Sequence, residues 1–213
     1  MVEKNIPVIR EPPLKEILRV NQRGFGYINP EVDRSYIETI SLGKCVGVYV
    51  RDVNRQLQAL AHIDDANYLG HHLGYRNQTH NFLEYLKYGQ RTNEIFDSVL
   101  VLRSEQADKK GIDEIYSTLK MRGHRGTEII DGGHSIKVIF DKNGNMYWLD
   151  PETIKAEERS DDEWKLFGLE IMTRDGLKCE NTGKIVGRAV SHPKYYTEKI
   201  LDGKTFTFGG HPY

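Results

Sequence analysis

The sequence has few cysteines and no long hydrophobic run. Only two of the 213 residues are cysteines, Cys45 and Cys179. Such sparse use does not suit a secreted domain built on disulfides and favours a reducing compartment, so a Cys45–Cys179 bridge or redox pair is the less favoured state. The longest apolar runs have the length of a strand, far below the roughly 20 residues that a membrane helix requires. The sequence therefore predicts one large buried core and no association with a membrane.

The charges are nearly balanced, and no secretory leader is visible. The 30 Lys and Arg residues against 31 Asp and Glu residues give a net charge of −1 at pH 7, so nothing electrostatic suggests nucleic acid as a partner. Residues 1–16 carry charges and prolines throughout and lack the apolar segment of a Sec signal peptide. We expect a cytoplasmic protein, or one exported to a host cell without a Sec-type signal.

The spacing of apolar residues predicts a mixture of strands and helices. Strands are predicted at residues 35–41, 45–51, 56–63, 97–102 and 128–131, and helices at 79–88 and 109–121. Asn143-Gly144 separates two alternating runs, 134–140 and 145–149, and is the strongest short signal for a hairpin. These elements predict an α+β fold in a single domain that covers residues 1–213.

The remaining segments give weaker signals. Residues 1–30 are expected to be irregular, because the run Gly24-Phe25-Gly26-Tyr27 has the composition of a loop. The polar stretch 64–78 indicates another loop. Residues 155–164 indicate a charged helix face or a linker, and residues 165–213 indicate short strands and loops.

A cysteine opens one predicted strand, and a histidine lies near the end of the next. If the turn between them is a four-residue loop at 52–55, opposed residues have numbers that sum to 107, and Cys45 faces His62. Their Cβ atoms would then be about 4.5–5.5 Å apart, within reach of a thiol–imidazole hydrogen bond. A three-residue loop would pair His62 with Lys44 or Val46 and reverse the alternation, so the residues alone leave the register open.

A cysteine–histidine pair of this kind can perform acyl transfer. A neighbouring imidazolium lowers the pKa of a thiol, and the thiolate attacks a carboxamide carbon. The imidazolium then protonates the departing amine, and the neutral imidazole activates the incoming water. The backbone amides of the bend at Gly43, Lys44 and Cys45 are candidates for holding the oxyanion, because glycine permits a tight turn. Cysteines beside strands most often pack in the core, so a purely structural Cys45 stays open.

Two stretches of the sequence resemble a known enzyme family. TISLGKCVGVYVRD, from Thr39, and ALAHID, which ends at Asp64, are similar to the signature of the CheD family of chemoreceptor glutamine deamidases. Residues 111–148 resemble a later segment of that family, with a helix, a strand, an Asp-Gly-Gly turn and a hairpin. The resemblance implies that Cys45 is the nucleophile, His62 the base and Thr39 the orienting third member of a catalytic triad.

The resemblance also implies a fold and a reaction. The cysteine-hydrolase fold looks like that of amino-terminal asparagine amidohydrolases and bacterial cytotoxic necrotizing factors, an α/β/β/α-type sandwich with the Cys–His pair at a sheet edge. The reaction would be deamidation of glutamine, or asparagine, in a partner protein through a thioester and without a cofactor. An exported effector acting on a host protein is one form of this activity. Transglutamination and a non-catalytic protein-binding module on the same scaffold are the alternatives.

The sequence departs from the family pattern at three places. Lys44 replaces a small residue and could lower the pKa of the thiol or simply lie in solvent. Asp64 and Asp65 follow the histidine, where the family has apolar residues and a proline, and could raise the pKa of His62. The resemblance covers about residues 36–149, and residues 151–213 form an extension that we expect to pack on the core.

Three histidines raise the question of a metal site. His71, His72 and His80 are close in the sequence, but adjacent histidines rarely ligate one ion, and no cysteine completes a regular spacing. We therefore expect no metal.

Overall fold

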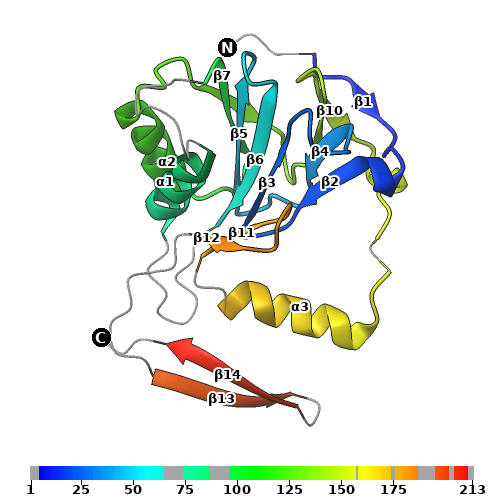
Figure 1. Ribbon diagram of the computed structural model, residues 1–213, viewed down its shortest axis with the longest axis vertical. Helices are drawn as coiled ribbons and strands as arrows, with labels where there is room; N and C mark the ends of the chain where they lie inside the picture. The colour runs from blue at the N-terminus through cyan, green and yellow to red at the C-terminus, as the bar shows by residue number, and fades with distance from the viewer. Residues whose placement is uncertain are drawn as a thin grey trace.

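Two β-sheets lie face to face, and two helices cover the outer face of the larger one (Figure 1). The computed structural model describes residues 5–64, 74–86, 96–156, 158–173, 176–186, 195–201 and 204–210. None of the helices in these segments is long and apolar enough to span a membrane.

The larger sheet has seven strands in the order β12-β11-β3-β6-β5-β7-β8. In chain order these are β3 Gly24–Ile28, β5 Val46–Asp52, β6 Leu57–Ile63, β7 Ser98–Arg103, β8 Glu128–Asp131, β11 Leu177–Cys179 and β12 Ile185–Val186. The four central strands pair antiparallel, while β11 and β8 join them in parallel. The β6 strand is buried along its whole length, as expected for a strand covered on both faces.

The smaller sheet has five strands in the order β1-β10-β9-β4-β2. Their bounds are β1 Val8–Ile9, β2 Ile17–Val20, β4 Tyr36–Thr39, β9 Val138–Asp141 and β10 Met146–Leu149. The predicted hairpin at Asn143-Gly144 is confirmed, because β9 and β10 pair antiparallel and Gly144 adopts a φ of 82° in the turn. A further pair, β13 Tyr195–Leu201 and β14 Lys204–Gly210, forms a two-stranded sheet.

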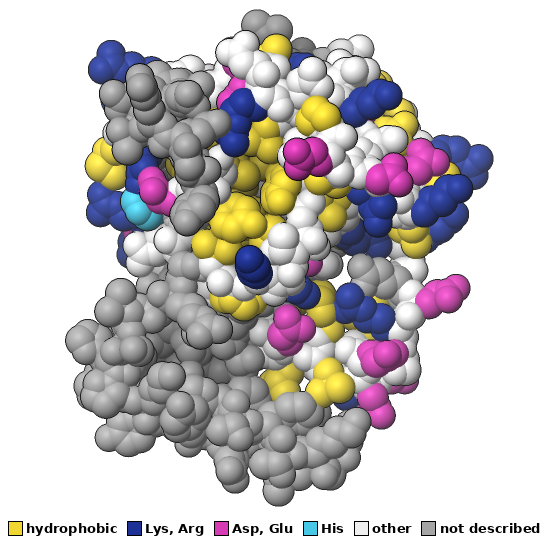
Figure 2. Space-filling view, viewed as in Figure 1, with side chains coloured by type: hydrophobic (Ala, Val, Ile, Leu, Met, Phe, Trp, Pro, Cys, Tyr) yellow, Lys and Arg dark blue, Asp and Glu magenta, His cyan; other side chains and the backbone are white. Residues whose placement is uncertain are grey.

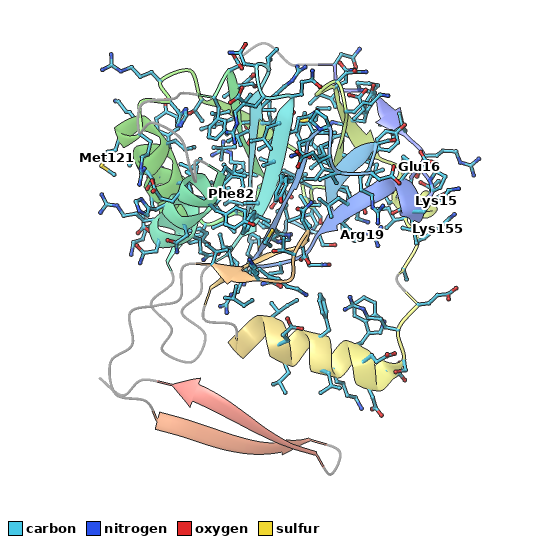
Figure 3. All side chains as sticks on the ribbon, viewed as in Figure 1. Lys15, Glu16, Arg19, Phe82, Met121 and Lys155 are labelled. Atoms are coloured by element: carbon cyan, nitrogen blue, oxygen red, sulfur yellow. The ribbon has the colours of Figure 1, made fainter. Side chains whose placement is uncertain are left out.

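Two amphipathic helices form the layer outside the seven-stranded sheet. They are α1 Tyr75–Leu86 and α2 Lys109–Met121. The predicted bounds of α2 are correct, since the Asp108 side chain accepts hydrogen bonds from the first turn, and Gly123 follows the helix with a φ of 89°. Phe82 points from α1 onto the sheet (Figure 3), where its ring lies 5.7 Å from that of Phe25.

The seven-stranded sheet has a hydrophobic core on each face. The helix-side core combines Val48, Ala61, Phe82 and Ile115 with their neighbours, all buried. The inter-sheet core is formed by the opposite side chains of the same strands with those of β4 and β9. Its members are Val20, Ile28, Ile37, Leu42, Tyr49, Leu60, Leu102, Ile130, Ile136, Val138 and Phe140. Alternation along each strand therefore separates two chemically distinct layers.

The outer face of the five-stranded sheet carries a small hydrophobic cluster of Ile17, Ile139 and Leu149, with Ile154 packed against it, and a group of charged residues. Arg19 of β2 contacts the buried carboxylates of Glu11 and Glu38 and donates to the carbonyl of Lys155, 3.0 Å away (Figure 3). The 3-10 helix Pro151–Thr153 lies in the same segment as Lys155. The α+β sandwich is confirmed, but the expected second helical layer is not found among the described residues.

The seven-stranded sheet draws on residues beyond the predicted family-like region 36–149. Residues 24–28, expected to be a loop, are β3, which pairs with β6. A Cβ at Gly26 would lie 2.7 Å from Leu18 Cδ2, so the Leu18 side chain would have to move. The extension contributes β11 and β12 as well as the helix α3 Asp161–Thr173. The prediction for residues 24–28 was wrong because partner strands, not local composition, stabilise such a short segment. The strands expected in residues 165–213 are confirmed by β11 and β12, whereas α3 begins in the charged stretch 155–164 and continues to Thr173, where strands and loops were expected.

Candidate active site

A hydrogen bond between the two sheets joins two of the residues predicted from the sequence. Thr39 Oγ1 of β4 lies 2.8 Å from His62 Nδ1 of β6, and both side chains are buried. Thr39 is the last residue of β4, and His62 is the penultimate residue of β6. The contact therefore forms at one end of the inter-sheet core, where side chains from the two sheets face each other.

The threonine hydroxyl fixes which nitrogen of the histidine carries a proton. Thr39 Oγ1 donates its single hydrogen to the carbonyl oxygen of Val20, 3.0 Å away. It must then accept from His62, so Nδ1 carries the hydrogen and Nε2 of the neutral ring carries the lone pair. Nε2 is buried and makes no hydrogen bond within the described residues. The arrangement leaves Nε2 as a base with no partner.

The β5–β6 register differs from the predicted one. Opposed residues sum to 109, so that Gly47 rather than Cys45 faces His62. The four-residue loop is Val53–Gln56 instead of 52–55, with Gln56 in the left-handed region at a φ of 49°. Because this loop still has an even length, Cys45 stays on the same face as His62, one diagonal away. Diagonal neighbours are about 7–8 Å apart, so the two residues are close without being directly opposed.

Glycines lie on both sides of His62 in the sheet. Gly24 of β3 and Gly47 of β5 are its direct cross-strand neighbours. A Cβ at Gly24 would lie 2.7 Å from Glu180 Oε1, and one at Gly47 would lie 3.0 Å from Leu42 Cδ1. Neither strand therefore places a side chain directly beside the imidazole. The sequence reasoning did not detect these two positions, because their meaning depends on which strands pair.

Burial keeps both candidate catalytic groups neutral in this conformation. Burial lowers the pKa of His62 from 6.5 to about 4. Burial, followed by the nearby Asp64 carboxylate, raises the pKa of Cys45 from 9.0 to about 12, although Arg23 acts in the opposite direction. The expectation that the carboxylates after His62 raise its pKa is therefore wrong, and so is the expected resting thiolate–imidazolium pair.

The bend before Cys45 is built differently from the prediction. Ser41, rather than Gly43, adopts the left-handed conformation, with a φ of 60°. A Cβ at Gly43 would meet nothing closer than Gln106 Oε1 at 3.9 Å, so the bend does not require glycine there. The Ser104 hydroxyl donates to the Gly43 carbonyl and holds the bend against the end of β7. Lys44 is exposed, which agrees with the solvated alternative.

A buried ion pair that the sequence reasoning did not detect lies beside this bend. Arg23 Nε donates to Asp64 Oδ1 at 2.9 Å, and the two side chains are 1% and 6% exposed. Gln22 donates to the second oxygen of Asp64 at 2.6 Å, while Gln78 of α1 binds the backbone of Asp64. The sequence pattern relates Asp64 only to His62, and Arg23 falls in the stretch expected to be irregular.

The second cysteine belongs to the other face of the sheet. Cys179 is fully buried in the helix-side core, while Cys45 is half-buried and packs against the inter-sheet core. Both are free thiols. Since the sheet separates these two cores, the alternative of a Cys45–Cys179 redox pair is not supported.

The described residues contain one of the three histidines considered for a metal site, and a large cavity lies apart from Cys45. His71 and His72 fall outside the described residues, and His80 of α1 contacts Arg122. In the described part of the chain, no group of three or more His, Cys, Asp or Glu side chains could hold a metal ion. A cavity of about 770 Å³ includes Tyr27, Leu57 and Tyr85 in its lining, at the other end of the β5–β6 hairpin. Figure 2 shows hydrophobic side chains gathered in the middle of the face on which α1 and β12 lie.

No model of a known protein family matches the chain, and no curated protein matches it significantly. The architecture defines the class as an α+β sandwich of two mixed sheets.

Proposed function

We propose that the protein is a cysteine-dependent protein glutamine deamidase with Cys45 as nucleophile, His62 as base and Thr39 as orienting residue. The observation that carries the proposal is the Thr39–His62 hydrogen bond of 2.8 Å, which leaves Nε2 unprotonated on the face that Cys45 shares.

The first half of the reaction forms a thioester and releases ammonia. His62 Nε2 takes the proton of the Cys45 thiol as Sγ attacks the carbonyl carbon of a glutamine side chain. The C–N bond of the tetrahedral intermediate then breaks, and the imidazolium returns the proton to the leaving NH₂ group. A neutral thiol and a neutral imidazole are the correct starting pair for this general-base route, which differs from attack by a preformed thiolate.

The second half hydrolyses the thioester. His62 Nε2 removes a proton from water as the water oxygen attacks the acyl carbon, and the thiol leaves with that proton. The product is glutamate, and Cys45 is regenerated. An amine in place of the water would give transglutamination by the same steps.

The bend before Cys45 supports a site for the developing oxyanion. The N–H groups of Gly43 and Lys44 make no hydrogen bond to any residue that the structure describes. The Gly43 carbonyl is held by Ser104, which fixes the orientation of the following peptide unit. Amides that are free and fixed in direction are suited to bind the oxyanion of a tetrahedral intermediate.

The test compares the two cysteines. The purified protein and its Cys45→Ala and Cys179→Ala variants are incubated with proteins of a cell lysate, and ammonia release and the mass change of glutamine-containing peptides are measured. We expect deamidation by the wild type and by Cys179→Ala but not by Cys45→Ala. Equal ammonia release by Cys45→Ala would contradict the proposal. Incorporation of monodansylcadaverine would indicate transglutamination.

A second candidate is a non-catalytic protein-binding module on the same scaffold. It is favoured by the pKa of Cys45, about 12, and by the lack of a hydrogen bond from the thiol to His62 Nε2. The pH dependence of iodoacetamide labelling at Cys45 separates the two candidates. A catalytic pair predicts slower labelling in His62→Ala, whereas an inert cysteine predicts no dependence on His62.

A further inference from the structure

The Arg23–Asp64 pair is an unusual feature for the interior of a protein. The guanidinium and the carboxylate are both almost completely buried, and removing one partner would leave an uncompensated charge. Arg23 itself has a φ of 53°, a backbone conformation that is uncommon for residues other than glycine. A strained, buried, charged residue costs free energy of folding, and such residues cluster at functional sites.

The position of Asp64 relates the pair to Cys45. Extending the β5–β6 register by one residue beyond Val46 and Ile63 places Cys45 opposite Asp64. Burial disfavours the ionised form of the thiol most, and both partners of the pair act on it in addition, the carboxylate disfavouring and the guanidinium favouring ionisation. The candidate nucleophile therefore lies next to two opposite charges.

Three further contacts fix the pair in place. Arg23 Nη1 donates to the carbonyl of Ile171 near the C-terminal end of α3, 3.0 Å away, where a cation is favoured by the helix dipole. Gln22 donates to the second oxygen of Asp64, and Gln78 Nε2 donates to its backbone carbonyl at 2.6 Å. The extension after residue 150 thus takes part in holding a group beside the predicted site.

Three other charged or titratable groups of the described residues lie on the strands and the bend next to Cys45. His62 lies on the same face, and burial keeps it neutral at pH 7. Lys44 is exposed. On the other side of β5, Arg103 is opposite Val46 and is paired with Asp131. Arg23 and Asp64 are therefore the buried charges that the structure sets against this thiol.

We propose that Arg23 and Asp64 are positioning residues that set the reactivity of Cys45, with the carboxylate holding the thiol protonated and the guanidinium limiting that effect. The proposal deepens the proposed function, since it assigns the control of the same cysteine. In this arrangement the thiol stays protected between turnovers and ionises only when His62 removes its proton during attack.

The test measures the rate of iodoacetamide labelling at Cys45 between pH 7 and 10, with the labelled peptide identified by mass spectrometry. In this reaction the thiolate displaces iodide and forms a C–S bond, so the rate follows the ionised fraction. We expect Asp64→Asn to label about tenfold faster than the wild type at pH 8, and Arg23→Gln about tenfold slower, since each unit of pKa changes the thiolate fraction about tenfold.

The opposite directions are the decisive result. A merely structural role predicts that both substitutions loosen the fold and expose the thiol, so both would label faster. The double variant Arg23→Gln/Asp64→Asn should return toward the wild-type rate, because both charges are gone. If the two single variants change in the same direction, or if neither changes, the proposal is overturned.

A matched control comes from the other buried ion pair. Arg19→Gln and Glu38→Gln break a charged contact on the outer face of the five-stranded sheet. They should lower stability without changing the pH profile of Cys45. The readout needs no substrate, so its outcome is independent of the deamidation test. If the wild type releases no ammonia but the two single variants still change the labelling rate in opposite directions, the proposed function fails and the role of the ion pair stands. If ammonia is released but the labelling rates do not change in opposite directions, the role of the ion pair fails and the proposed function stands.

Discussion

The two faces of the seven-stranded sheet are made by the same strands and hold different kinds of core. The helix-side core is built from aliphatic and aromatic side chains, with Phe25 and Phe82 in edge-to-face contact. The inter-sheet core is equally dry around the stacked rings of Tyr49 and Phe140, 3.8 Å apart, but it ends at the polar contact of His62 and Thr39.

The comparison shows that one sheet carries a packed core on one face and a candidate reactive site at the end of the other. The helix-side layer consists of apolar side chains, and its residues Tyr27, Leu57 and Tyr85 also line the cavity of about 770 Å³. On the other face, the glycines opposite His62 leave the imidazole without cross-strand neighbours, and the buried polar groups there depend on individual hydrogen bonds. The candidate chemistry therefore lies at the end of the inter-sheet face, and the helix-side face is an apolar layer.

The largest expected effect removes a ring from the helix-side core. Phe82→Ala should lower the free energy of unfolding by about 3–5 kcal/mol, because it leaves a cavity at a fully buried position. Urea denaturation measures the loss. Alkylation of Cys179, in the same core, should become faster, while that of Cys45 should change little. An equal gain at both cysteines would show that the two faces do not behave as separate layers.

The second prediction concerns pH and the inter-sheet face. The pKa of His62 is about 4 in the folded protein and 6.5 when the residue is free, so between these values the unfolded chain binds a proton that the folded protein does not. Stability from this residue is complete above pH 6.5 and decreases by up to about 3 kcal/mol as the pH falls to 4. Urea denaturation at pH 7.5 and 4.5 should show this decrease in the wild type, and a smaller one in His62→Gln.

The third prediction isolates the hydroxyl between the sheets. Thr39→Val keeps the shape of the side chain but leaves His62 Nδ1 and the Val20 carbonyl unpaired, at a cost of about 1–3 kcal/mol. Under the proposed function, deamidation should slow by about 10- to 100-fold, since the imidazole loses its orientation. Thr39→Ser, which retains the hydroxyl, serves as the control. Equal rates in the two variants would remove Thr39 from the proposed site.

The smallest effects distinguish two glycines. Gly47→Ala should cost about 1 kcal/mol or more, because its Cβ would lie 3.0–3.2 Å from Leu42 and Leu102 side-chain atoms. Gly43→Ala should stay within about 0.5 kcal/mol of the wild type, because the space around it is open. Thermal unfolding of both variants is sufficient. A larger loss at Gly43 than at Gly47 would contradict this account of the bend.

The sequence predicted correctly the helices and strands whose periodicity and cap or turn residues lie within the segment itself. The helix 109–121 and the strand 128–131 have the predicted bounds, and the Asn143-Gly144 hairpin formed as expected. Each has its own periodicity and its own cap or turn residue. The helix predicted at 79–88 begins earlier, at Tyr75, where buried Gln78 and Thr79 hide the start of the periodic pattern.

Pairing decided what local signals could not. Residues 24–28 are a central strand because β6 and β11 lie on either side, although two glycines give the segment the composition of a loop. The centre of the turn after Asp52 lies one residue later than predicted. Each residue of β5 therefore faces a residue of β6 two positions further along than predicted, and Gly47 lies opposite His62. The even loop length preserved the faces, so Cys45 and His62 share one side as predicted.

The sequence by itself determined which residue types stand at strand ends on which face, because alternation along a strand is a property of the chain alone. Tertiary structure decided the partners: Thr39 from a second sheet for His62, and Arg23 from a distant loop for Asp64. Burial then set the charges, lowering the pKa of His62 and raising that of Cys45. Desolvation depends on everything that surrounds a group, and no local stretch of sequence contains that information.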